Sequence, residues 1–398
     1  MYLRGSRWHM QRQRKKRRSN PAFIGLLVML IAAGIYFNNY VIPTIPLPSA
    51  PTPTPTRDPE SFISAAKTAF NEGNLLNSIE SYQQAIMLSP GNPAIYLELA
   101  RVQVLSGRYE AAQTSASNAL LLSPDNPTGH AILGWTLNYL GDRSSAEAAL
   151  QRALQLDPNS ALAHAFYAEY LADMQEYVQA GEESRIALEL DNTLLEVRRA
   201  RGYVLETTAN YEEAAFEYQQ AMAINDRIAG LHLALGRTYR ALERYDDAIE
   251  QFVIADSLNP ADPIPNTQIG LIYITTGEFG RAVQAMLQAV SEDPGNPIRH
   301  GNLGVAYYRN RQPVEAIDAF TLAIRGGMTE NGVAVQGLPL EYGQVAAFYY
   351  MYGLSLAREG RCPEALPIAQ GLIAAVPEDL IAVSNANEMI SICSGGGG

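Results

Sequence analysis

The residues LHLALGRTYRALERYDDAIEQFVIADSLNP, from Leu231 to Pro260, decide the fold of this chain. Their apolar and small side chains recur at intervals of three and four residues, which predicts two successive amphipathic helices. A turn around Glu243 separates the helices, and Asn259-Pro260 ends the second one, because proline cannot continue a helix. Neither helix can bury its apolar stripe alone, so we expect the two to pack against each other in antiparallel fashion.

The same pattern repeats every 34 residues along most of the chain. Each unit ends in a loop, and one position of this loop is equivalent in all units. In chain order it is occupied by Pro90, Pro124, Pro158, Asn192, Asp226, Pro260 and Pro294. The first helices share a column of small residues: Ala66, Ala100, Gly134, Ala168, Gly202, Gly236, Gly270 and Gly304. The second helices share another: Ala85, Ala119, Ala153, Ala187, Ala221, Ala255 and Ala289. This period predicts stacked helix pairs that share one continuous core.

Two repeats and one connection depart from the pattern. Asn192 and Asp226 replace the closing proline of repeats four and five, and Gln175 and Ala209 stand where a turn glycine is expected. We expect local loosening of these loops. After repeat eight, the next unit is displaced by fifteen residues, so we assign residues 326–343 to an insertion that leaves the solenoid surface. Such an insertion is either a binding loop or a neutral connection.

The repeats resemble the tetratricopeptide repeat family. The pattern is clearest in repeat seven, at Ile269, Gly270, Tyr273, Gly277, Phe279, Ala282, Ala289 and Pro294. Repeat two carries it at Tyr96, Leu99, Ala100, Gly107, Tyr109, Ala112, Ala119 and Pro124. The resemblance extends from about Pro59 to Pro377. It implies an all-α, right-handed superhelix of about nine helix pairs plus a C-terminal capping helix over residues 60–393, followed by a flexible tail, 394–398. The family's motif residues are structural, so they do not specify a ligand.

The formal net charge of −12 averages two unlike regions. Residues 1–20 contain eight Lys or Arg and no acidic residue, whereas the remainder has a net charge of −20. The 47% apolar content excludes a wholly disordered chain. A strongly acidic body also argues against nucleic acid as a partner, because phosphate binding requires a basic surface. We interpret residues 1–20 as a cytoplasmic tail whose charge sets membrane orientation.

An apolar segment follows the basic tail. Residues 22–37 contain no charged side chain, and the run through Ile42 is long enough to cross a membrane as a helix. We therefore predict a transmembrane helix over 21–42, with residues 22–42 in the cell membrane, the N-terminus in the cytoplasm and the repeats outside it. A cleaved signal peptide is the competing interpretation. Residues 43–59 hold seven prolines and predict an extended linker.

The two cysteines fall at the C-terminal end of the array. Cys362 begins the second helix of repeat nine, and Cys393 ends a final helix over about 379–393. Consecutive helices joined by a short turn run antiparallel, so the start of one lies beside the end of the next. We predict a disulfide between the two cysteines, formed outside the cytoplasm. The alternative is a pair of reduced, buried thiols.

The sequence contains no recognisable catalytic or metal-binding motif. Four histidines occupy one column in the first helices, namely His130, His164, His232 and His300. No nearby acid or cysteine completes a metal site, so we interpret them as packing residues. The abundant carboxylates are expected on solvent-facing helix surfaces. We predict neither an enzyme nor a cofactor or metal requirement.

Function is then expected in the groove lined by the first helices. Its acidic residues end after Glu206, while arginines continue above an apolar floor. The candidate partner-binding residues are Arg101, Arg199, Arg237, Arg240, Leu271, Ile274, Tyr308, Arg309, Tyr350 and Arg358. Arginines above an apolar floor favour a protein or peptide segment with acidic and apolar side chains. A scatter of solvated arginines would give the same pattern.

These features predict a membrane-anchored scaffold that binds protein partners outside the cytoplasm. Such a scaffold would assemble envelope or surface complexes. An alternative hypothesis is a non-catalytic accessory or regulatory subunit of a secretion or glycan-assembly system.

Overall fold

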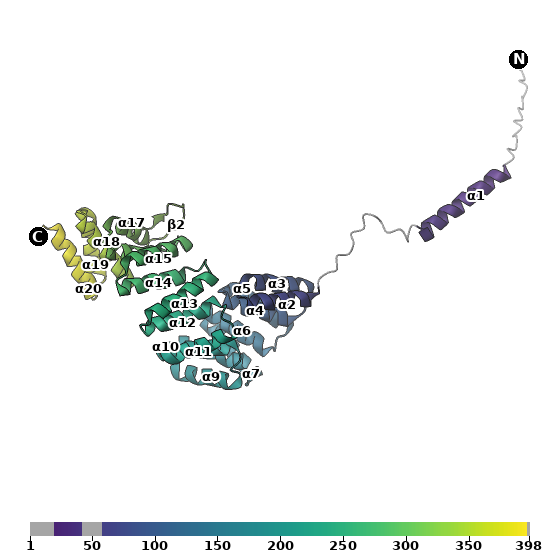
Figure 1. Cartoon of the computed structure of the whole chain (residues 1–398), viewed down its shortest axis with the longest axis horizontal. Helices are drawn as coiled ribbons and strands as arrows, with labels where there is room; N and C mark the ends of the chain where they lie inside the picture. Colours follow the sequence, from purple (N-terminus) through teal and green to yellow (C-terminus); the bar gives the residue numbers. More distant parts are fainter. Residues whose placement is uncertain (1–19, 42–57, 396–398) are drawn as a thin grey trace, which may run out of the picture. The chain divides into compact units, whose positions relative to one another are not determined.

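The computed structural model describes residues 20–41 and 58–395, which belong to two units divided after Arg57 (Figure 1). In the first unit, helix α1 (Pro21–Tyr36) continues into a π-helical turn, η1 (Phe37–Val41). Asn20 caps α1 by accepting a hydrogen bond from the backbone N–H of Ala22 at 3.2 Å. An 18-residue window within residues 21–40 has a mean hydropathy of 1.9, and the segment is long and apolar enough to cross a membrane.

The second unit is an array of antiparallel helix pairs. The first helices of the pairs are α2 (Pro59–Asn71), α4 (Pro93–Leu105), α6 (Pro127–Tyr139), α8 (Ala161–Asp173), α10 (Leu195–Thr207), α12 (Ala229–Ala241), α14 (Pro263–Thr276), α16 (Pro297–Arg309) and α18 (Gln344–Arg358). The second helices are α3 (Leu75–Leu88), α5 (Tyr109–Leu122), α7 (Arg143–Leu156), α9 (Tyr177–Leu190), α11 (Tyr211–Ile224), α13 (Tyr245–Leu258), α15 (Phe279–Glu292), α17 (Pro313–Arg325) and α19 (Cys362–Ala375). The array ends with α20 (Leu380–Cys393), so the predicted solenoid of nine pairs and a capping helix is confirmed.

A small residue facing a large one sets the distance between the helices of a pair. A β-carbon on Gly236 would lie 2.6 Å from the ring of Phe252, sixteen residues later in the partner helix. The same close approach recurs at Gly134–Leu150, Gly202–Tyr218, Gly270–Met286 and Gly304–Phe320. Since a larger side chain would force the helices apart, the small-residue column is a packing requirement.

The turn within each pair uses a left-handed residue in every repeat. This position is glycine at Gly107, where φ is 74°, but it is Gln175 and Ala209 in repeats four and five, where φ is 63° and 60°. The turn therefore keeps its geometry without glycine, and the expected loosening is wrong. Left-handed conformations are costly for residues with a β-carbon, so these two turns are strained.

We predict that Ala209→Gly raises the free energy of unfolding by about 0.5–1 kcal/mol. Relief of the left-handed strain outweighs the greater freedom of glycine in the unfolded chain. The measurement is urea unfolding followed by circular dichroism. Gly107→Ala is the reverse control: its β-carbon would meet nothing within 4 Å, so only the backbone penalty applies and stability should fall. A lower unfolding midpoint for Ala209→Gly would contradict the strain.

The insertion after repeat eight folds back onto the array. It forms a short antiparallel hairpin of β1 (Gly327–Met328) and β2 (Ala334–Val335). Val335 is buried, and the backbone N–H of Leu338 donates to the carbonyl oxygen of Ala323 in α17 at 2.9 Å. The prediction that this segment leaves the solenoid surface is therefore wrong for its second half, where Leu338 and Leu340 pack against the C-terminal core, whereas Met328 in the hairpin is exposed.

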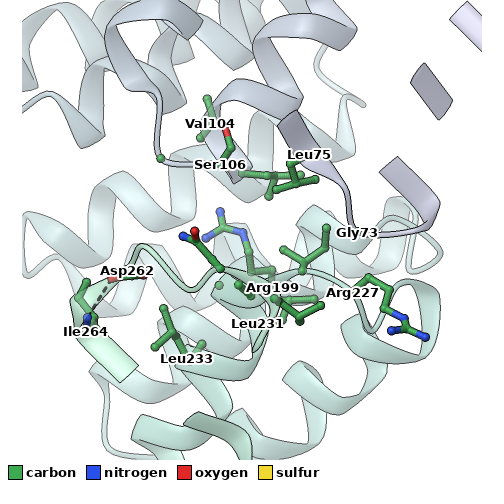
Figure 2. Close-up of a pocket in the computed structure, with 18 of the residues that line it drawn as sticks. Gly73, Leu75, Val104, Ser106, Arg199, Arg227, Leu231, Leu233, Asp262 and Ile264 are labelled. Atoms are coloured by element: carbon green, nitrogen blue, oxygen red, sulfur yellow. Dashed lines mark hydrogen bonds between the residues drawn. The ribbon is translucent and has the colours of Figure 1, made fainter. Parts of the chain in front are cut away.

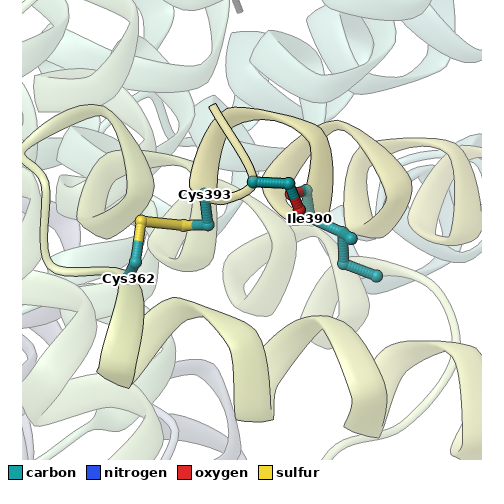
Figure 3. The surroundings of a disulfide bond; sticks show 4 residues. Cys362, Ile390 and Cys393 are labelled. Carbon is teal, nitrogen blue, oxygen red and sulfur yellow. A yellow bond between two sulfur atoms is a disulfide. The ribbon is translucent and has the colours of Figure 1, made fainter. Parts of the chain in front are cut away.

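Helix α20 packs against α18 and α19 and closes the C-terminal end of the array. Cys362, at the start of α19, and Cys393, at the end of α20, form a disulfide with their Cα atoms 5.4 Å apart (Figure 3). The antiparallel arrangement of the two helices brings these ends together, as the sequence predicts.

We predict that protein isolated from its native membrane without reductant has no thiol that labels under denaturing conditions. Replacing both cysteines with alanine should destabilise the cap by about 3–4 kcal/mol, because the cross-link closes a long loop in the unfolded chain. Thiol labelling and mass spectrometry before and after reduction provide the measurement. Two labelled cysteines before reduction would contradict both the cross-link and an oxidising location for the repeats.

Candidate functional site

The first helices line the inner side of the array. First helices of successive pairs contact one another directly, whereas each second helix packs chiefly on the first helices beside it. All ten predicted groove residues belong to first helices, but their surroundings differ between the two halves of the array. Arg101 and Arg199 lie on α4 and α10, while Arg240 and Arg309 lie further along, on α12 and α16.

Three arginines in the N-terminal half are neutralised within the chain. Arg101 forms ion pairs with Glu98 and with Glu196, which is 1% exposed. Arg199 pairs with buried Glu169 and lies over the ring of Trp135. The expectation that carboxylates occupy solvent-facing surfaces is wrong for Glu169 and Glu196, because each lies buried against an arginine.

Arg237 is also neutralised by a glutamate of the chain. Its Nε and Nη2 donate to the two carboxylate oxygens of Glu206 at 3.0 and 3.3 Å. Burial favours neutral groups, but a bidentate pair of this kind stabilises both charged forms. Arg237 therefore offers a partner little net charge.

Repeat one touches the junction of repeats five and six. The side-chain amide of Asn225 donates to the carbonyl oxygen of Phe70 at 3.1 Å. A β-carbon on Gly73 would lie 2.4 Å from Cβ of Arg227, so the two backbones are in close contact. Ile228 is 1% exposed beneath this contact. The first six repeats thus close on themselves.

The sequence holds one signal for this closure. The residue before each first helix is usually a polar cap, such as Asn92, Asn126 or Asn296, whose side chain accepts a backbone N–H. In repeats five and six this position is apolar, at Leu194 and Ile228, and neither helix has a side-chain cap. Leu194 is half-buried and Ile228 is 1% exposed, so the apolar residue narrows the search for the closure to these two positions without locating it.

A hollow of about 1000 Å³ lies beside the closure (Figure 2). Leu75 and Ser106 of the N-terminal repeats face Leu233 and Ile264 of repeats six and seven across it. Arg199, already paired with Glu169, forms part of its wall.

The C-terminal half presents arginines in a different state. Arg240 donates to the side-chain oxygen of Gln268, and Arg309 is exposed. Within residues 58–395, neither has a carboxylate partner at ion-pair distance. Arg358 pairs with Glu388 of α20 at 2.9 Å and donates to the hydroxyl of Tyr308 at 3.1 Å.

Apolar side chains form the floor beside these arginines. Four of the predicted groove residues are half-buried here: Leu271, Ile274, Tyr308 and Tyr350. Burial raises the pKa of Tyr350, and nearby Arg309 opposes that rise. This surface combines available positive charge with apolar area, which suits an acidic and apolar ligand.

The four histidines of the column share one contact. The Nε2 atom of each faces the carbonyl oxygen of the loop residue six positions earlier, at 2.8 Å for His130, His232 and His300 and 3.0 Å for His164. The packing interpretation is confirmed, because each ring ties a closing loop to the following helix.

His164 differs from His232 in its second partner. Nδ1 of His164 faces the carboxylate of Glu183, whereas Nδ1 of His232 faces the side-chain amide of Gln251 at the same position of its repeat. Both ring nitrogens of His164 therefore face oxygen acceptors, which only the doubly protonated ring can satisfy. The hydrogen bond to Glu183 raises the pKa of His164 above 6.5.

We predict that Glu183→Gln lowers the pKa of His164. Because the folded-state pKa is raised, the stabilisation is fully present below about pH 6.5 and is lost as the pH rises through the raised value. Titration of the histidine ring resonances by NMR measures the pKa directly. His232, whose Nδ1 faces an amide, is the internal control, and the Glu183→Gln substitution should leave its ring resonances unchanged. An unchanged His164 pKa would show that the carboxylate does not hold the proton.

These features define an α-solenoid of paired helices, an architecture that supports a protein-interaction scaffold. Models of the tetratricopeptide repeat match residues 69–135, 129–160, 231–254 and 267–331. The chain belongs to the tetratricopeptide repeat superfamily. A search of curated proteins finds no match.

One of the similar solved structures supports the fold assignment. The Cut9–Hcn1 hetero-tetramer of the APC/C superimposes with a TM-score of 0.59 at 14% identity, covering 82% of this chain and 64% of that chain. This chain thus spans less than two thirds of that protein's length. A tetratricopeptide repeat protein from Parabacteroides merdae matches with a TM-score of 0.41, 18% identity and coverage of 62% and 98%. YrrB, described as having an unusual peptide-binding site, matches with a TM-score of 0.37, 24% identity and coverage of 44% and 91%.

Proposed function

We propose that this protein is a membrane-anchored, non-catalytic scaffold that holds a segment of a partner protein against α12, α14, α16 and α18. The observation that carries the proposal is the difference between the two halves of the inner surface. Arg101, Arg199 and Arg237 have carboxylate partners within the chain, whereas Arg240 and Arg309 have none among the described residues.

The chemistry of this surface specifies the partner's class. An acidic side chain gains a charge-assisted hydrogen bond from an unpaired guanidinium, and it leaves no internal ion pair broken. Apolar side chains of the same segment cover Leu271, Ile274 and Tyr350. The partner segment therefore carries acidic and apolar residues on one face, and its binding weakens as salt screens the charges.

We infer that the repeats of this scaffold lie outside the cytoplasm. Eight basic residues precede the apolar helix, and the positive-inside rule keeps such a tail in the cytoplasm. The disulfide between Cys362 and Cys393 supports the same orientation, because structural disulfides persist in oxidising compartments. A scaffold held there assembles envelope or surface proteins.

We predict that Arg240→Glu with Arg309→Glu weakens binding of a labelled Glu/Leu peptide of about twelve residues at least tenfold, because both charge-assisted contacts become repulsive. Fluorescence anisotropy of the full chain in detergent measures the affinity. A Lys/Leu peptide of equal length should gain affinity for the same variant.

The matched control is Arg143→Glu with Arg152→Glu on α7, a second helix. It changes the net charge equally but leaves the inner surface intact, so affinity should stay within about twofold. An equal loss of affinity in both variants would show that net charge alone causes the effect. Unchanged affinity in Arg240→Glu with Arg309→Glu would contradict the proposed surface.

A further inference from the structure

We propose that the hollow between repeats one and two and repeats six and seven is a pocket for one aromatic side chain of the bound partner segment. This inference rests on the proposed function and adds an anchor to it. The pocket exists because repeat one folds back on the start of repeat six, which encloses space that an open array would leave to solvent.

Tyr139 forms a stacking platform in the wall of this pocket. The ring of Tyr109 covers one face of Tyr139, with centroids 4.6 Å apart and planes 2° from parallel. Trp135 meets it edge-on at 6.1 Å, and Arg199 donates to its hydroxyl at 3.1 Å. These three contacts fix the ring in place.

The remaining surface of Tyr139 is open to the pocket. Burial raises the pKa of its hydroxyl, yet 43% of the residue is exposed. Protein atoms therefore surround Tyr139, and solvent still reaches it, as expected for a residue in the wall of a hollow. An incoming aromatic ring can stack on it at the geometry that such pairs prefer.

The charges in the wall disfavour an acidic occupant. Arg199 is neutralised by Glu169, and Arg237 by Glu206. An acidic ligand would compete with these internal carboxylates and would also face Glu72 and Asp262, which line the pocket. A neutral ring meets the apolar side chain of Leu233 without breaking either ion pair.

The pocket and the proposed partner-binding surface share helices α12 and α14. Arg237 lines the pocket, and Arg240 lies one helical turn further along α12. Ile264 lines the pocket from the first turn of α14, which continues to Leu271 and Ile274. A volume of about 1000 Å³ admits a ring together with its flanking backbone. The partner segment thus anchors its ring at the repeat-six end.

Gly230 offers a way to fill the pocket without disturbing the fold. It is the second residue of α12, it is exposed, and its β-carbon would meet no atom within 4 Å. Gly280 is the second residue of α15 and shares all three properties, but it does not line the pocket. Gly230→Phe and Gly280→Phe are therefore matched variants.

The test uses Trp135 as a reporter in the full chain. The sequence has two tryptophans, so Trp8→Phe leaves only the one in the pocket wall. N-acetyl-phenylalaninamide is the probe, titrated in the millimolar range that suits a single side chain. We expect saturable change in Trp135 emission for the parent and for Gly280→Phe, and at least tenfold weaker binding for Gly230→Phe. N-acetyl-aspartamide, the acidic counterpart, should give no saturation.

Two outcomes would overturn the pocket. One is the absence of a saturable response to the aromatic amide in the parent, and the other is an equal response in Gly230→Phe. Failure of the proposed function is separate, because the Arg240→Glu with Arg309→Glu variant should still bind the amide. If the aromatic amide does not bind but the Glu/Leu peptide does, the proposed function stands and the aromatic pocket is contradicted.

Discussion

The approach of two helices through a small residue is the constraint on which the structure depends. Where Gly236 faces Phe252, the helix backbones lie close enough that no side chain larger than hydrogen fits without a shift. The same contact recurs at Gly134, Gly202, Gly270 and Gly304, and alanine holds this column at Ala66, Ala100 and Ala168. A small residue therefore lets the two helices of each of these pairs approach closely. The lined inner surface is a consequence of the stacking of the pairs.

The two halves of the array use the inner surface differently. In the first six repeats, buried carboxylates such as Glu169 and Glu196 neutralise arginines, and repeat one closes over Ile228. From α12 onward the first helices contain no acidic residue, so Arg240 and Arg309 keep their charge for a ligand. Internal pairing stabilises the closed half, and its absence leaves the other half available for recognition.

Local features were predictable because each depends on residues within one or two units. The 34-residue period predicted the helix pairs, and the short turn before α20 predicted that Cys362 lies beside Cys393. The same period placed His164 and His232 in one column of the first helices, where each ring contacts a closing loop. The turn at Ala209 was misjudged, because the packing of both helices holds a left-handed residue there at a cost in strain.

The sequence by itself determined the repeat, the order of the helices and which residues belong to the inner side. These follow from periodicity, which acts over short chain distances. Only the tertiary structure decided that repeat one meets Ile228, that the insertion folds onto the core near Val335, and that Arg199 is paired while Arg309 is not. Such contacts depend on small rotations between units that accumulate along the array, and no single repeat encodes their sum.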